Sequence, residues 1–238
     1  MGESKNQNFN HLKIHSQYSI CEGAIKIDDL KDFSKENKIK SLALCDTTNL
    51  CGALEFAEKI SKVGTQPIIG TQINFKFNET TGLLPLYALN EPGYKRIIEL
   101  SSLSFLKNDR VSEPHLEFEE LLKNNDGIAL FSGTIYGLFG QLFDKGKFTE
   151  ISELYSKLKS CYQDKFYIEI QRHSDQNEFA FEKFNLAQSF DLEIPLIATN
   201  EVFYLNKDMH EAHDALICIK NKTYVNDKNR LKFSNQHY

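Results

Sequence analysis

Histidine and carboxylate side chains that could bind a divalent metal ion occur close to the start of the chain. His11 and His15 lie four residues apart in a short segment, residues 11–16, whose alternation of apolar and polar residues predicts a β-strand. Both histidine side chains should therefore point to one face, and Lys13 should point to the same face. A lysine ammonium inside a ligand cluster opposes the binding of a cation. This segment therefore predicts a polar cleft and is a poor basis for a metal site.

Further oxygen donors follow other predicted strands. Asp46 ends the apolar run of residues 41–46, which is typical of a buried parallel strand. Two threonines follow Asp46, so we expect its carboxylate to cap the following turn. Glu22 and Glu201 could each supply a carboxylate, whereas Gln72 could supply only a neutral carbonyl. His173 and His213 have no obvious ligand partner nearby, and we expect them to be surface or packing residues.

Strands and helices that would position these side chains alternate for most of the chain. Strands are predicted at residues 11–16, 41–46, 66–77, 83–89, 127–133, 166–171 and 195–199. Helices are predicted at residues 27–37, 52–63, 91–103, 139–143, 147–161, 178–190 and 207–220. Such alternation predicts an α/β fold with a parallel sheet, either doubly wound or closed into a barrel. In barrels, functional residues gather at the carboxyl ends of the strands.

Composition excludes several classes of protein. The 238 residues are 41% hydrophobic and include 18 Phe and 10 Tyr, which excludes intrinsic disorder. No apolar run approaches the roughly 20 residues of a membrane-spanning helix, and the polar first ten residues do not form a signal peptide. The net charge of −5 argues against a broad nucleic-acid-binding surface. Five cysteines without a CxxC pair predict reduced, buried thiols, so we expect a cytoplasmic protein.

Ordered motifs along nearly the whole chain carry a resemblance to a known family. They lie at residues 11–19 with 22–24, then at 42–52, 67–70, 90–94, 168–173, 198–204 and 211–214. In this order they resemble the polymerase and histidinol phosphatase (PHP) domain family, in the version found in the alpha subunit of bacterial replicative DNA polymerase III. The resemblance implies a distorted (β/α)7 TIM-like barrel of the PHP type. It also implies a flexible N-terminus at residues 1–10, a PHP domain at residues 11–220 and a tail at residues 221–238 that leads toward an absent polymerase region.

Active members of the family hold up to three metal ions and hydrolyse phosphoesters, but the resemblance implies a degenerate metal site here. The residual metal-site positions are His15, Glu22 and Glu201, with His11, Asp46 and Gln72 nearby. Ligand positions that carry another residue are Lys13, Thr47, Leu83, Thr134 and Phe203. A metal-bound hydroxide needs enough ligands to hold the ion, so we expect no catalytic residue, no cofactor and no tightly bound divalent metal in this domain. We expect Lys13 to pair with Glu22 or Glu201 in place of a lost cation.

The function implied by the resemblance is that of an N-terminal fragment of an alpha subunit, which is a DNA-directed DNA polymerase (a nucleotidyltransferase) of DNA replication. The expected role is structural and partner-docking, with Mg²⁺ used only in the absent polymerase module. Expected partners are that module, the proofreading exonuclease subunit, and DNA through the holoenzyme. We expect residues 207–238 to expose apolar surface toward the missing module. The alternative is a metal-dependent phosphoesterase or pyrophosphatase related to histidinol phosphatase, using Mn²⁺ or Zn²⁺.

Overall fold

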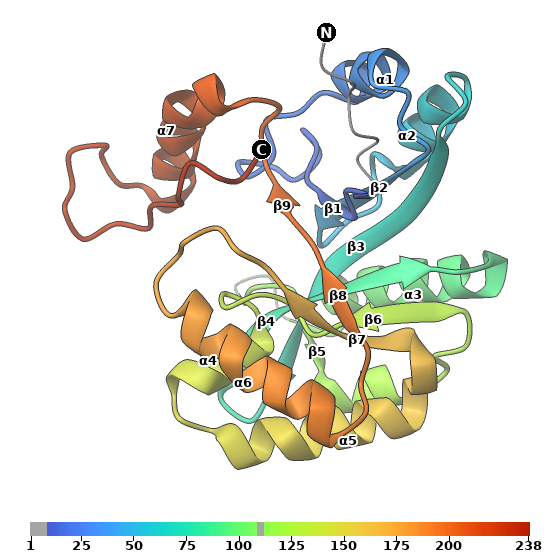
Figure 1. Ribbon diagram of the computed structural model, residues 1–238, viewed down its shortest axis with the longest axis vertical. Helices are drawn as coiled ribbons and strands as arrows, with labels where there is room; N and C mark the ends of the chain where they lie inside the picture. Colours follow the sequence, from blue (N-terminus) through green and yellow to red (C-terminus); the bar gives the residue numbers. More distant parts are fainter. Residues whose placement is uncertain (1–8, 109–111) are drawn as a thin grey trace, which may run out of the picture.

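A curled sheet of nine strands forms the centre of the computed structural model, which describes residues 9–108 and 112–238 (Figure 1). Along its main path the strand order is β8-β7-β6-β4-β3-β2-β1-β9, and β5 pairs with β3 off this path. The strands are β1 (Lys13–Ile14), β2 (Ser41–Thr47), β3 (Gln66–Phe77), β4 (Thr80–Ala88), β5 (Leu116–Glu117), β6 (Ile128–Phe131), β7 (Phe166–Ile170), β8 (Leu196–Ala198) and β9 (Glu201–Val202).

The two ends of this sheet are joined by one short segment of chain. Strand β8 pairs with β7, and β9 pairs with β1, yet only Thr199 and Asn200 separate β8 from β9. The same extended segment therefore contacts both edges and curls the sheet round on itself. This arrangement confirms the predicted distorted TIM-like barrel.

Strand β4 departs from the expected parallel arrangement. It runs antiparallel to both of its neighbours, β3 and β6, whereas the other pairings in the sheet are parallel. The cause is a tight connection: Asn78 and Glu79 alone link β3 to β4, and Asn78 adopts a positive φ of 53°. Asparagine tolerates this left-handed conformation better than most residues. The strand therefore starts at Thr80, three residues before the predicted start at residue 83.

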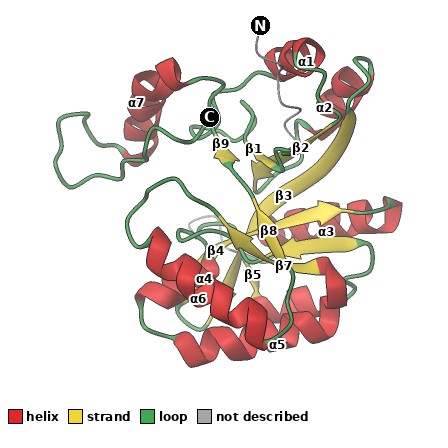
Figure 2. Ribbon diagram, in the orientation of Figure 1, coloured by secondary structure: helices red, strands yellow, loops and turns green. Residues whose placement is uncertain are grey.

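Helices cover the outside of the sheet at both ends of the molecule (Figure 2). They are α1 (Ile27–Glu36), α2 (Ala53–Ser61), α3 (Glu91–Leu106), α4 (Leu138–Asp144), α5 (Phe148–Tyr162), α6 (Glu178–Asp191) and α7 (His210–Asn221), with 3-10 turns η1 (Phe118–Leu122), η2 (Gln163–Lys165) and η3 (Lys207–Met209). Within the described residues no helix is long and apolar enough to cross a membrane.

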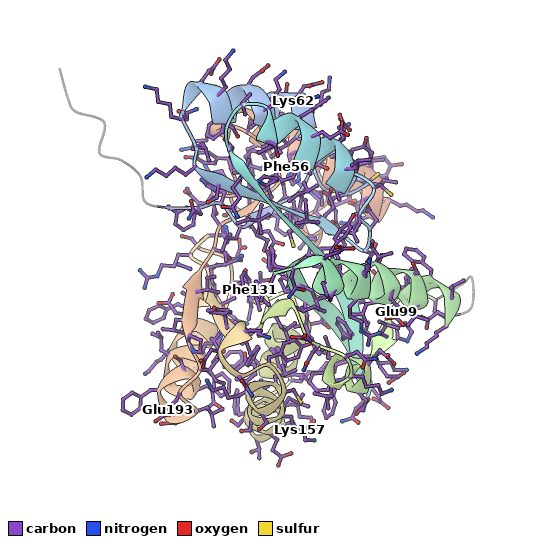
Figure 3. The ribbon with its side chains drawn as sticks, turned by 90° about the vertical axis from the view of Figure 1, so that its right-hand side faces the viewer. Phe56, Lys62, Glu99, Phe131, Lys157 and Glu193 are labelled. Carbon is purple, nitrogen blue, oxygen red and sulfur yellow. The ribbon has the colours of Figure 1, made fainter. Side chains whose placement is uncertain are left out.

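Two separate hydrophobic cores lie between the sheet and the helices that cover it. The larger core packs β3, β4, β6 and β7 against α3, α4 and α5, and the smaller core packs β1 and β2 against α1 and α2. A third group, which includes Cys45, Tyr87 and Phe131, lies apart from both. Figure 3 shows Phe56 of the smaller core in the upper part of the molecule and Phe131 near the middle. The long strand β3 runs between the two parts (Figure 1).

The chain ends differ from the expectations in detail. Only Lys13 and Ile14 of the predicted strand at residues 11–16 are paired in the sheet. Most of the N-terminus predicted to be flexible, residues 1–8, lies outside the described residues. Residues 222–238 contain no helix or strand, but they fold back beside β9, where the Phe203 amide donates to the His237 carbonyl oxygen at 3.0 Å. Arg230 also anchors this tail to α7 through two 2.6 Å contacts with Asp214.

The five cysteines are free thiols, as predicted. Cys45 and Cys218 are buried, but Cys51 and Cys161 are exposed, so the prediction of buried thiols is wrong for these two.

Candidate functional site

One cleft gathers most of the positions that the sequence singled out. It has a volume of about 100 Å³ and is lined by side chains from β1, β3, β4, β9, α7 and the tail. The predicted positions among its lining residues are Lys13, Glu22, Gln72, Leu83, Thr134, Glu201 and Phe203. Lys220 of α7 and two apolar tail residues, Leu231 and Phe233, also line it. The cleft is therefore the candidate functional site.

Lys13 is the central charge of the site. Its side chain is buried, and its Nζ lies 3.4 Å from Glu201 Oε1 and 3.6 Å from Glu169 Oε1. The parallel pairing of β1 with β9 sets Lys13 directly beside Glu201. Burial lowers the pKa of Lys13, but the attraction of Glu169 and Glu201 outweighs burial and holds the pKa above its ordinary value. The ammonium group is therefore charged and lies between two carboxylates, and the predicted pairing of Lys13 with Glu201 is confirmed.

Glu201 is held in place by a second contact. His15 Nε2 lies 3.1 Å from Glu201 Oε1, and the His15 ring stacks on Phe203 with centroids 4.7 Å apart. Burial raises the pKa of Glu201, but Lys13 and His15 together bring it well below its ordinary value. Glu201 is thus an ionised carboxylate whose negative charge is already matched.

Glu22 has its own lysine. The Lys220 ammonium of α7 pairs with Glu22 Oε1, and the Thr47 hydroxyl donates a 2.6 Å hydrogen bond to Glu22 Oε2. The Gln72 amide donates in turn to Thr47 Oγ1 at 2.9 Å. Both carboxylate oxygens of Glu22 are therefore occupied. Lys13 does not pair with Glu22, so of the two pairings considered for it from the sequence, only the one with Glu201 forms.

Two of the predicted residues serve other purposes. Asp46 accepts hydrogen bonds from the amide and hydroxyl of Ser16, at 2.7 and 2.8 Å, and from the Ser19 hydroxyl at 2.7 Å. It therefore holds the turn that follows β1, and the prediction that it caps the turn after β2 is wrong. His11 is not among the residues that line the cleft, and its ring packs edge-on against Phe9.

Glu169 and Lys220 were missed in the sequence analysis. Glu169 lies in the apolar strand β7, and a single carboxylate in such a strand is the one signal that could have marked it as a buried charge. Lys220 lies at the polar end of α7 and resembles any surface lysine, so only the fold brings it to Glu22.

The metal ions implied by the family resemblance do not fit this cleft. The two carboxylates that line it, Glu22 and Glu201, and the neighbouring buried Glu169 each pair with a lysine ammonium. Among the other positions, the Gln72 amide bonds to the Thr47 hydroxyl and His15 Nε2 contacts Glu201, while leucine and phenylalanine offer no ligand atom. Glu169 Oε2 is buried without a hydrogen-bond partner in the described residues, but one free oxygen does not make a chelating set.

Comparison with known proteins identifies the family to which the chain belongs. The model of the PHP domain family matches residues 11–173, and the chain belongs to this family. The fold is also that of a solved amidohydrolase structure from Chromobacterium violaceum, with bound SO4 and no metal. The two share a TM-score of 0.54 and 12% identity over 87% of this chain and 96% of that one.

The similar curated proteins are named DNA polymerase III subunit alpha. That of Caulobacter vibrioides is 33% identical over 100% of this chain and 22% of that protein. That of Rickettsia felis is 37% identical over 89% of this chain and 18% of the relative, and that of Borreliella burgdorferi is 31% identical over 97% and 21%. The chain thus spans about a fifth of the length of these relatives.

Proposed function

We propose that this chain is the amino-terminal PHP domain of a DNA polymerase III alpha subunit, and that its role there is structural. The structural role is supported by one observation, the pairing of the cleft carboxylates with Lys13 and Lys220. These two ammonium groups offset most of the negative charge of Glu22, Glu169 and Glu201. Because Lys13 is fully buried and charged, a divalent ion beside it would be repelled by several kcal/mol at an effective dielectric constant of about 20.

The proposed partners are the polymerase module of the same subunit, the proofreading exonuclease subunit and, through the holoenzyme, DNA. Exposed apolar side chains on α7 and the tail support a docking role, because Ile219 and Tyr224 are 70% and 80% exposed and Val225 is 54% exposed. The proposed location is the cytoplasm, where DNA replication takes place.

Two measurements test this proposal. The first is a thermal-unfolding comparison of this chain with and without the polymerase region of the relatives supplied as a second chain. Association at micromolar concentration and a higher unfolding midpoint are expected. The matched variant is Tyr224→Ser, which should weaken the association without changing the midpoint of the isolated chain. No association and no shift would contradict the docking role.

The second measurement is an aryl-phosphate hydrolysis assay in Mn²⁺ or Zn²⁺. We expect no turnover above that of a protein-free control, and the double variant Lys13→His/Thr47→His should restore only weak metal affinity in the cleft because Gln72 and Phe203 still lack the needed donors. Turnover that His15→Ala abolishes would instead support the phosphoesterase or pyrophosphatase alternative.

A further inference from the structure

A second cluster of histidine and carboxylate side chains lies where the tail meets the barrel, outside the cleft lining. His173 and Asp175 come from the loop between β7 and α6, and His237 comes from the tail. One ring nitrogen of each histidine and one Asp175 oxygen all lie within 4.8 Å of one another. The side chains of both histidines are buried, and that of Asp175 is 5% exposed. The sequence led us to expect no tightly bound divalent metal in this domain, on the ground of the cleft positions, and this cluster departs from that expectation.

The hydrogen bonds of His237 leave one nitrogen facing a carboxylate. Its Nδ1 lies 3.0 Å from the carbonyl oxygen of Glu201, which can only accept, so Nδ1 carries a hydrogen and donates. Its Nε2 lies 3.3 Å from Asp175 Oδ2. A neutral His237 would point a lone pair at this carboxylate, so a cation is needed between the two atoms. That cation is either a proton on Nε2 or a metal ion.

The observed spacing suits a metal ion. Two ligand atoms bound at about 2.0–2.1 Å to a tetrahedral Zn²⁺ lie roughly 3.3 Å apart. A backbone carbonyl that accepts from the far nitrogen is also the usual support of a metal-binding histidine, because it fixes the tautomer that exposes the other lone pair.

His173 has the same kind of support. Its Nε2 lies 2.6 Å from Asn200 Oδ1, and Asn200 is oriented by its own 2.8 Å donation to the carbonyl oxygen of Tyr238. This contact is much shorter than the 3.3 Å approach of the Glu201 amide to the same nitrogen, so Nε2 donates to Asn200. Glu178 Oε1 lies 3.4 Å from the other ring nitrogen, Nδ1. Glu178 adds a second negative charge beside the cluster.

We propose that His173, Asp175 and His237 form a binding site for one divalent cation of the Zn²⁺ type, which fastens the tail to the barrel. Two neutral imidazoles and one carboxylate are ligands that suit Zn²⁺, and a fourth position is open to water. The two imidazole rings stack with centroids 3.9 Å apart and an interplanar angle of 9°, so binding of one ion by both requires the rings to turn out of this parallel arrangement. The site joins segments more than 60 residues apart and holds Leu231 and Phe233 at the cleft.

The test is zinc binding by the 238-residue chain after removal of metals with EDTA. Equilibrium dialysis against micromolar Zn²⁺, with elemental analysis, should give one ion per chain. His237→Ala and Asp175→Asn should each weaken binding by more than the roughly 10–100-fold that the loss of an outer-shell partner costs. Asp175→Asn keeps the shape of the side chain, and circular dichroism shows whether each variant is folded. The controls are His115→Ala, outside the cluster, and Glu22→Gln in the cleft, and both should keep the ion.

Two further readouts identify the site. Co²⁺ in place of Zn²⁺ should give visible absorption without the thiolate charge-transfer band that a cysteine ligand would produce. Zn²⁺ should also slow trypsin cleavage at Lys228, Arg230 and Lys232 in the original chain but not in His237→Ala. A chain that binds no Zn²⁺ at micromolar concentration, or whose zinc is fully retained by both His237→Ala and Asp175→Asn, would overturn the proposal. In either case the cleft and the proposed function would stand unaffected.

Discussion

Replacing Lys13 with methionine tests whether the cleft depends on its internal cation. The change keeps the length and apolar stem of the side chain but leaves Glu169 and Glu201 facing each other without the ammonium that lies 3.4–3.6 Å from both. At an effective dielectric constant of about 20, each of these contacts amounts to roughly 5 kcal/mol of gross attraction. The cost of burying three charges offsets most of that attraction in the folded protein.

The net loss should still be large, because one partner of a buried ion pair is removed and the other charges stay behind. Such changes destabilise proteins by about 3–5 kcal/mol. At roughly 2–4 °C per kcal/mol for a domain of this size, the thermal midpoint should fall by about 10 °C. The loss should shrink as the pH falls from about 7 to about 5, because the two carboxylates can then relieve their repulsion by taking up a proton.

Urea unfolding followed by far-UV circular dichroism measures this loss, since the chain has no tryptophan. The double variant Lys13→Met/Glu201→Gln should be more stable than Lys13→Met alone, with a coupling energy of about 0.5–3 kcal/mol. The matched control is Lys95→Met, which removes an exposed ion pair with Glu91 and should change stability by less than about 1 kcal/mol. Unchanged stability in Lys13→Met, or no rescue by Glu201→Gln, would refute the reasoning.

Three other predictions concern the rest of the molecule. Burial raises the pKa of Glu120, but hydrogen bonds from basic side chains bring this pKa from 4.5 down to about 2. The ionised Glu120 should therefore stabilise the fold fully above pH 4.5, and this stabilisation should disappear as the pH falls toward 2. A urea-unfolding series at decreasing pH should show this loss in the original chain but not in Glu120→Gln. Burial raises the pKa of the Cys45 thiol to about 12, so a disulfide reagent should label exposed Cys51 in the folded chain and Cys45 only after unfolding; rapid labelling of Cys45 without denaturant would contradict its burial. Gly93→Ala would place a Cβ 1.8 Å from the carbonyl oxygen of Gly127, so it should lower the free energy of unfolding by about 1–3 kcal/mol in the same assay. An unchanged unfolding midpoint would mean that the two segments can separate freely.

The elements of the barrel were largely predictable, because apolar periodicity is a local property of the sequence. Helices and strands such as α5 and β3 lie within a few residues of their predicted bounds. Strand direction was not predictable by the same means, because it depends on connection length. The two-residue link at Asn78 and Glu79 allows only an antiparallel return, and this overrides the general pattern of alternating strands and helices.

The charges of the cleft were predictable only in part. A pairing of Lys13 with Glu22 or Glu201 could be predicted from the conflict between a lysine and the ligand positions around it, but the sequence did not distinguish the two partners. Lys220 and His237 come from the last helix and the tail, far from their partners in sequence. Their contacts depend on how the tail folds back beside β9, and no local pattern encodes that path.

The separation of the hydrophobic cores affects how the molecule unfolds locally. Two cores with few shared side chains should behave as two cooperative unfolding units, and the smaller one, around α1 and α2, should exchange its amide hydrogens first. Lys13 belongs to the smaller half and Glu169 to the larger, so their ion pair crosses the boundary between the units. The ion pair between Lys13 and Glu169 would then hold the two subdomains together, and its loss should let them unfold separately.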